Sequence, residues 1–333
     1  MIARAKWWIL AFTSLALFGN YYAYDSIAPV ADLLHRQLGF SDTQIGTLNA
    51  IYSLPNIVLV LVGGVLVDRF GAARVMLWTT VICLAGAVLT ALGAHFPVMA
   101  AGRLLFGIGA ETLSVATLVA ITHWFTGGGL ALAMAVSIGV ARLGSYGADM
   151  SPSFVGGLYA KGWQPPLWFA AGLAFTAVVM ALLYLWIDRH AKSPAVLKKA
   201  GEDRFRLGDL ASFGRSYWYL LALNVLFYGV IFPFRSTFAI EYFQHAHGLT
   251  LDAAGRVNSY VFFAAVFATP AFGWFADRVG QRSLLLVFGS LLLPLAFVIL
   301  ALTSWNLWVT TVLIGISFSL VPAVIWPCVS YLV

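Results

Sequence analysis

Long apolar stretches separated by short polar segments run along the whole chain. Each stretch holds about 18 or more mostly apolar residues, which is enough for a helix to cross the hydrocarbon layer of a membrane. Inside that layer every backbone N–H and C=O needs a partner within the protein, and the stretches lack the alternation of barrel strands. The sequence therefore predicts an all-α polytopic membrane protein. The ten predicted spans lie at about 7–30, 44–67, 75–95, 97–125, 130–158, 166–187, 216–240, 252–275, 283–303 and 307–333.

Composition agrees with lipid as the main solvent. Apolar residues make up 61% of the 333 residues and charged residues only 10%, which is too little polar surface to cover a water-soluble globule of this size. No soluble basic domain carries the net charge of +6, so we interpret it as a signal of membrane orientation and predict no nucleic-acid partner. Cys83 and Cys328 both lie in apolar stretches, where a disulfide framework is not expected.

One long polar segment, 188–215, divides the chain. It carries seven Lys and Arg residues and is predicted to be a cytoplasmic linker. It joins an amino-terminal six-helix bundle, 1–187, to an incomplete carboxy-terminal bundle of four helices, 7 to 10, at 216–333. With the amino terminus also inside, cytoplasmic segments carry 13 Lys and Arg residues and outer segments carry three. This bias follows the positive-inside rule and predicts a cytoplasmic amino terminus.

The two halves repeat in sequence. A shift of 209 residues superposes seven identical residues. Because this offset spans six helices, both copies have the same orientation, which predicts parallel bundles related by an axis along the membrane normal, as in transporters. The superposed pairs are Gly39 and Gly248, Gly46 and Gly255, Asn49 and Asn258, Gly64 and Gly273, Asp68 and Asp277, Arg69 and Arg278, and Gly71 and Gly280.

The repeat contains two copies of a short loop rich in glycine and charge. Gly64 and Gly273 are interpreted as sites of close helix packing, and Gly71 and its counterpart Gly280 as tight turns. In each copy the aspartate can meet the positive end of a neighbouring helix. The second copy disfavours the alternative of an ordinary cytoplasmic loop. Both copies resemble the signature loop of the major facilitator superfamily, which implies a gating role. The gating residues so implied are Gly64, Asp68, Arg69, Gly71, Asp277 and Arg278.

Three further stretches resemble the branch of that superfamily that includes the lysosomal dipeptide uniporter and its bacterial relatives. They are Tyr24-Asp25, 102–112 (GRLLFGIGAET) and 141–145 (ARLGS). In that branch a carboxylate of helix 4 and an arginine of helix 5 hold the two charged ends of a peptide, and Glu111 and Arg142 match them.

The chain also departs from that branch. The family has twelve helices, so a chain with ten is expected to be a fragment, or else not competent alone, with an accessory membrane subunit as one way to complete it. The short amino-terminal tail leaves no room for the acidic dileucine signal of lysosomal members. We therefore expect a plasma membrane or a bacterial inner membrane.

Charged side chains inside the predicted spans need a cavity or a partner, because a charge at the bilayer centre costs about 3 kcal/mol or more. Glu111 and Arg142 lie at similar distances along the chain from the predicted turn at 126–129, so they share one depth on adjacent helices. They form either a structural ion pair or a clamp for a zwitterion, with an amine on the carboxylate and a carboxylate on the guanidinium. For Arg103 and Asp149 we favour a structural ion pair.

Other polar residues in the spans leave alternatives open. The offset brings Asp25 next to Arg235 across the pseudo-twofold axis, which predicts a contact between bundles. The alternative is that Asp25 ends in water at the outer leaflet. Tyr22 and its neighbouring tyrosines either contribute to the solute site or form an interfacial belt.

A polar stripe on the second predicted span has two interpretations. Asn49, Tyr52 and Asn56 are spaced by one helical face. They either line a cavity or bond neighbouring helices.

Motifs of enzymes are missing from the sequence. The chain has no nucleotide-binding loop, nucleophile elbow or paired catalytic carboxylate, so we predict no enzyme activity, no cofactor and no metal site, and we interpret the His245 and His247 loop as a polar turn. The predicted function is alternating-access transport of a small polar solute, dipeptides or other zwitterions first, with the lipid bilayer as the other partner. Proton coupling, and the choice between uniport and symport, stay open. The alternatives are an organic-anion carrier and a non-transporting scaffold or receptor.

Overall fold

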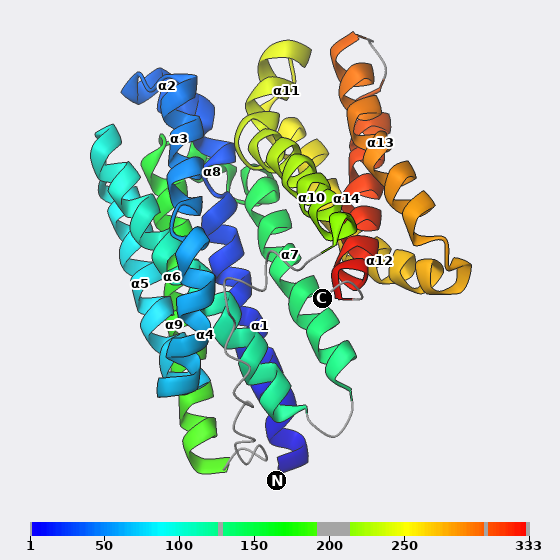
Figure 1. Cartoon of the computed structure of the whole chain (residues 1–333). Coiled ribbons are helices and arrows are strands. Elements are labelled where there is room, and N and C mark those ends of the chain that lie inside the picture. The colour runs from blue at the N-terminus through cyan, green and yellow to red at the C-terminus, as the bar shows by residue number, and fades with distance from the viewer. Residues whose placement is uncertain (1, 126–128, 192–213, 303–305, 331–333) are drawn as a thin grey trace. The chain divides into compact units, whose positions relative to one another are not determined.

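A computed structural model describes residues 2–125, 129–191, 214–302 and 306–330. Over these ranges every regular element is a helix. The chain forms two compact units (Figure 1). The first unit comprises Met1–Val196 with Ser236–Ser259, and the second comprises Leu197–Arg235 with Tyr260–Val333. The predicted linker falls largely on 192–213, outside the described residues.

The first unit is a bundle in which the longest helices share one core. In it, α1 packs on α7 and α9, α5 packs on α6 and α9, and both α3 and α4 pack on α6. Ile9, Met76, Leu113 and Ala120 are fully buried in this core. The elements are α1 (Ile2–Asp25), η1 (Ala28–Val30), α2 (Ala31–Leu38), α3 (Asp42–Ser53), α4 (Asn56–Phe70), α5 (Ala72–Leu92), α6 (Phe96–Trp124), α7 (Leu130–Phe154), α8 (Gly156–Tyr159), α9 (Gln164–Ala191), α11 (Ala239–His247) and the start of α12 (Leu251–Val279).

The second unit is built from fewer helices around an aromatic core. It holds α10 (Arg215–Pro233), the rest of α12, α13 (Arg282–Leu302) and α14 (Leu307–Ser330). The ring of Phe318 in α14 lies 6.0 Å from that of Phe232 and 5.5 Å from that of Phe262. The Ser317 hydroxyl donates to the carbonyl of Gly289 at 2.7 Å, where α13 and α14 pack closely. A π-helical segment, η3 (Phe234–Phe238), follows α10.

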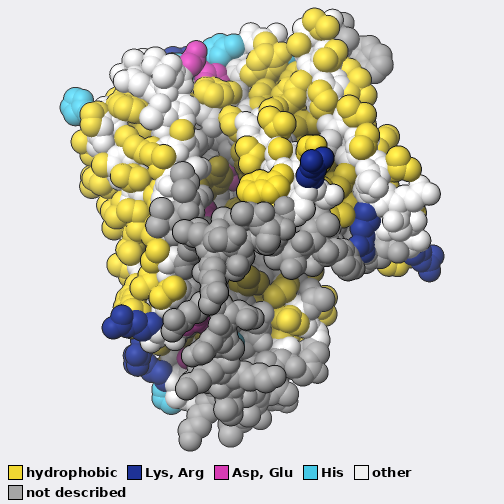
Figure 2. Space-filling model, viewed as in Figure 1, with side chains coloured by type: hydrophobic (Ala, Val, Ile, Leu, Met, Phe, Trp, Pro, Cys, Tyr) yellow, Lys and Arg dark blue, Asp and Glu magenta, His cyan; other side chains and the backbone are white. Residues whose placement is uncertain are grey.

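Seven described helices are long and apolar enough to cross a membrane. They are α5, α6, α9, α10 continued through η3 and α11, α12, α13 and α14. The other predicted spans are also helical, 7–30 as α1 and 130–158 mainly as α7, and the span at 44–67 is interrupted. There α3 ends at Ser53 and α4 begins at Asn56, with Leu54 and Pro55 between them, and Pro55 lacks the N–H that would continue the hydrogen-bond ladder. Apolar side chains cover much of the visible face (Figure 2), and Trp186 and Leu226 are more than half exposed, as lipid-facing residues are.

The sequence repeat has a counterpart in backbone geometry. Gly39 ends α2 with a φ of 68°, and its repeat partner Gly248 ends α11 with a φ of 65°. Gly71 and Gly280, one repeat apart, have φ values of 84° and 69°. Residues with a Cβ rarely adopt this left-handed region, so the tight turns expected at Gly71 and Gly280 are confirmed. The segment 236–259 packs with the first unit, whereas the predicted domain limits, which join it to the second half, stay a prediction.

Candidate functional site

A buried arginine ties the start of the first unit together. Arg103 of α6 is 2% exposed. Its guanidinium donates to the carbonyl oxygens of Leu48 and Ala23 at 3.3 Å each, to that of Tyr24 at 3.1 Å, and to Asn49 Oδ1 at 2.5 Å. These acceptors belong to α1 and α3. The arginine therefore holds two helices against α6, mainly through main-chain oxygens that stabilise the buried guanidinium.

Asn49 extends this network to the second half of the sequence. Its Nδ2 donates to the carbonyl oxygen of Ser236 at 2.9 Å and to Thr237 Oγ1 at 2.7 Å, while its Oδ1 accepts from Arg103. Asn49 is buried, so these bonds have no competition from water. Of the two interpretations of the polar stripe, Asn49 follows the one in which the stripe bonds neighbouring segments.

Glu111 lies one turn beyond the close contact of α6 with α3. Its Oε1 accepts from Asn56 Nδ2 at 2.7 Å and lies 3.5 Å from the hydroxyl of Tyr52. The contact depends on Gly107, because a Cβ there would lie 2.2 Å from the carbonyl oxygen of Tyr52. Glu111 is only half-buried. A carboxylate oxygen with two neutral donors on a half-buried residue is suited to exchange a hydrogen bond for a ligand cation.

Arg142 and Asp25 gather around a tyrosine of α1. The hydroxyl of Tyr21 lies within electrostatic range of Arg142, Glu111 and Asp25. Close packing of α7 on α1 brings this about, since a Cβ at Gly144 would lie 2.3 Å from the main chain of α1. Three predicted charges, from α1, α6 and α7, therefore lie within electrostatic range of one hydroxyl. The sequence analysis considered Tyr21 only as a neighbour of the predicted Tyr22.

Asp25 itself is buried, with 1% exposure at the end of α1. The alternative that it ends in water at the outer leaflet is therefore wrong. Arg235 is also buried, with its guanidinium 3.5 Å from the ring centre of Phe262 in the second unit. Because Asp25 and Arg235 belong to different compact units, the predicted contact between them stays a prediction.

Tyr22 and Asp149 lie together in the core of the first unit. The ring of Tyr22 packs edge-on against Phe169 at 5.7 Å, and its hydroxyl lies in electrostatic range of Asp149. A Cβ at Gly255 of α12 would lie 2.3 Å from the carbonyl oxygen of Asp149, so α12 approaches α7 closely here. The ion pair of Asp149 with Arg103 stays a prediction.

Comparison with known proteins places this geometry in a family. Residues 13–333 match the Major Facilitator Superfamily. The chain belongs to this superfamily. It is 30% identical to the lysosomal dipeptide transporter MFSD1 of Danio rerio over 98% of this chain and 73% of that protein. It is equally 30% identical to the lysosomal dipeptide transporter MFSD1 of Homo sapiens, over 95% of this chain and 70% of that protein.

Solved structures agree on the superfamily fold. A bacterial homologue of the human lysosomal transporter Spinster, in an inward-facing and unoccupied conformation, superposes with a TM-score of 0.75. The match covers 98% of this chain and 78% of that one, at 17% sequence identity. At this identity the likeness concerns the fold alone.

The two loops that resemble the superfamily signature differ in how their residues are arranged. Asp68 and Arg69 are exposed at the end of α4, with Arg69 against the ring of Phe70. In the second copy Arg278 lies over Trp274 at 4.5 Å. The side chain of Asp277 is outside the described residues. The gating role of both loops stays a prediction.

The packing role expected of Gly64 and Gly273 is not seen among the described residues. A Cβ at either position would meet none of their atoms within 4 Å. The close approach of α4 to α6 is instead made one residue earlier, where a Cβ at Gly63 would lie 3.4 Å from Thr112. The reason is helical geometry, since one residue turns the side chain by about 100° away from the neighbouring helix.

Proposed function

We propose that this protein carries dipeptides, or small zwitterions of similar length, across a membrane by alternating access. A member of the Major Facilitator Superfamily is a transporter, and the proposal concerns its solute. One observation carries it: an acid, Glu111, and a base, Arg142, come from different helices, α6 and α7, and both lie within electrostatic range of the hydroxyl of Tyr21. The names of the relatives support the same solute class.

In this proposal the solute is recognised by its two ends. Its ammonium group takes the place of Asn56 and Tyr52 at Oε1 of Glu111, a residue that is half-buried. Its carboxylate binds the planar fork of Arg142, which suits bidentate contact. Such a site recognises the backbone and tolerates varied side chains. Glu111 would also accept a proton, so proton coupling is compatible with the site.

The test is solute flux and binding in proteoliposomes. Glu111→Gln should weaken binding of dipeptides with a free amine and leave amino-blocked dipeptides almost unchanged, because only the free amine loses a charge partner. Arg142→Lys keeps the charge but loses the fork, so it should cost about 1–3 kcal/mol, or about 5- to 150-fold in affinity. Asp252→Asn, which changes a carboxylate paired with Arg256 on α12, is the matched control.

Two outcomes would contradict the proposal. The first is a folded Glu111→Gln protein that binds free and blocked dipeptides as the unchanged protein does. The second is that both variants unfold in mild detergent while their folded remainder binds dipeptide normally, in which case the acid and base are structural and the solute binds elsewhere.

Orientation belongs to the same proposal. We infer a plasma membrane or bacterial inner membrane with the amino terminus, the 188–215 segment and both signature loops in the cytoplasm, as the distribution of Lys and Arg favours. Single cysteines introduced at position 201 and at His95 report on it. An impermeant thiol reagent should label the second and spare the first in intact cells, and labelling at 201 would reverse the orientation.

A further inference from the structure

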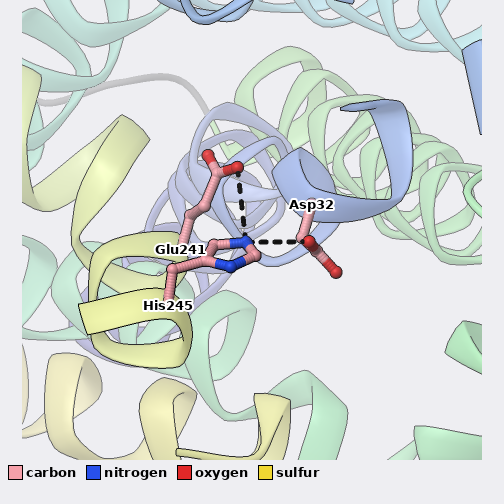
Figure 3. Close-up of side chains that lie close together, drawn as sticks. All are labelled: Asp32, Glu241 and His245. Carbon is pink, nitrogen blue, oxygen red and sulfur yellow. Dashed lines mark hydrogen bonds and ion pairs between the residues drawn. The ribbon is translucent and has the colours of Figure 1, made fainter. Parts of the chain in front are cut away.

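Five titratable side chains from three short elements of the first unit gather where α11 meets α2. Three of them, Asp32, Glu241 and His245, are drawn in Figure 3, and the other two are His35 of α2 and Asp42 at the start of α3. The ligand atoms of Asp32, Glu241 and His245 all lie within 4.8 Å of one another. This cluster is outside the solute site, and the sequence analysis treated His245 as part of a polar turn.

Each imidazole in the cluster faces two carboxylates through the same nitrogen. His245 Nε2 lies 3.0 Å from Asp32 Oδ1 and 3.9 Å from Glu241 Oε1. His35 Nε2 lies 2.9 Å from Asp42 Oδ1 and 3.0 Å from Glu241 Oε1. A neutral imidazole nitrogen carries at most one hydrogen, so it cannot satisfy two carboxylates at once. The arrangement therefore calls for additional positive charge.

The formal charges point the same way. With both imidazoles neutral, three carboxylates and one arginine, Arg36, which lies 3.0 Å from Asp32 Oδ1, leave two negative charges. Glu241 is largely buried, with a side chain only 13% exposed, and that of Asp32 is 11% exposed. A divalent cation neutralises such a cluster, whereas leaving like charges close together in a partly buried site is unfavourable.

The internal repeat explains why these residues meet. The offset of 209 superposes Asp32 on Glu241 and Arg36 on His245. Each pair is spaced i, i+4 on a short helix that ends at a left-handed glycine, Gly39 or Gly248. Equivalent faces of the two repeats therefore oppose each other, which puts two carboxylates together. The second repeat has an imidazole where the first has a guanidinium, and only the imidazole can bind a metal ion.

We propose that Asp32, Glu241 and His245 bind one zinc ion that fastens α11 to α2. Bonds of about 2.1 Å in a tetrahedron put ligand atoms about 3.4 Å apart, and the distances of 3.0 and 3.9 Å from His245 Nε2 lie on either side of this value. Imidazole together with carboxylates selects zinc or a similar transition metal over calcium and magnesium. His245 is half exposed, which leaves the fourth position open to water.

Binding has two consequences within the cluster. Arg36 shares Asp32 Oδ1 with the metal position, so the ion has to displace it from that oxygen. His35, Asp42 and Glu241 form an adjacent group of the same kind. Because both groups use Glu241, the stoichiometry is one ion per chain. Protons compete for the imidazole and the carboxylates, so zinc affinity falls as the pH drops below about 6.

The experiment is zinc titration of the full chain in detergent, by isothermal calorimetry and by competition with a chromophoric chelator, with no solute present. We expect saturable binding of one ion, at least tenfold weaker in His245→Gln and in Asp32→Asn. His95→Gln, an exposed histidine at the start of α6 and outside the cluster, should bind as the unchanged protein does. Monodispersity on gel filtration checks that each variant is folded.

Several results would overturn the proposal. No saturable zinc binding by a monodisperse protein would do so, as would His245→Gln with unchanged affinity. A loss confined to His35→Gln would show that the other group holds the ion. If acid alters the thermal stability of the unchanged protein but zinc does not, the cluster is a proton-sensitive contact and binds no metal. None of these readouts depends on transport, so they are independent of the proposed function.

Discussion

Asn49 accepts a hydrogen bond from Arg103 and donates to the segment that begins at Ser236, and a substitution can keep the first contact while weakening the second. Asn49→Asp keeps the acceptor for Arg103 but turns the donor toward Ser236 and Thr237 into a second acceptor. The Thr237 hydroxyl can turn and donate to the new carboxylate, but the buried carbonyl of Ser236, in the segment that α11 continues, loses its donor and faces a negative charge, at about 2 kcal/mol. The α3 to α6 connection is retained, and is stronger because the acceptor becomes charged. We therefore expect local opening of 236–247 to become easier by about 2 kcal/mol, which is about 30-fold in an opening equilibrium.

Hydrogen exchange measured by mass spectrometry in detergent tests this. Amides in 236–247 should exchange about 30-fold faster in Asn49→Asp, and amides in α9 should not change. Thr237→Val removes only one of the two hydrogen bonds, so amide exchange in 236–247 should be about fivefold faster. Unchanged exchange in 236–247, or an equal rise throughout the protein, would refute the assignment of Asn49 as the residue that holds this segment.

Three further predictions concern α6 and its neighbours. Gly107→Ala forces α6 away from Tyr52 and should lower thermal stability by about 1–3 kcal/mol, whereas Gly172→Ala, with open space around it, should be neutral or gain up to about 1 kcal/mol. Arg103→Lys cannot reach four acceptors with one ammonium group, so we expect about 1–3 kcal/mol of destabilisation in the same unfolding assay. Cys83, at 3% exposure, should react with a maleimide only after unfolding, and labelling of the native protein would contradict its burial.

The helical fold could be predicted because apolar length is a strong signal, and the repeat could be predicted because glycines with left-handed backbone mark its turns. The positions at which regular α-helix is interrupted were harder to predict. Pro55 is a signal of a break, but Pro152, Pro270 and Pro294 lie inside continuous helices, so a proline alone does not tell where a span is interrupted. The π-helical segment at Phe234–Phe238 has no sequence signature of its own.

The candidate site was predicted from charged residues inside the spans. This identified its charged residues but not all the groups that they contact. The sequence analysis expected a carboxylate as the partner of Arg103. Four of its hydrogen bonds go instead to three carbonyl oxygens and one side-chain amide of α1 and α3. Main-chain acceptors are present at every residue, so sequence cannot single them out. The cluster around Glu241 was missed for another reason. Its residues lie on short helices beside the spans, where charged residues are common and do not indicate a site. The 209-residue offset nevertheless aligns Asp32 with Glu241.

Glu111 also connects the two helices on either side of Pro55. Tyr52 lies one residue before the end of α3 and Asn56 begins α4, and both contact the same carboxylate oxygen. In the proposed function, a ligand ammonium group that takes this oxygen would break this connection, so the angle between α3 and α4 would be coupled to occupancy through one atom. A solute without a positive end would leave the connection in place. On that proposal, recognition of charge and stiffness of the second span would be a single property.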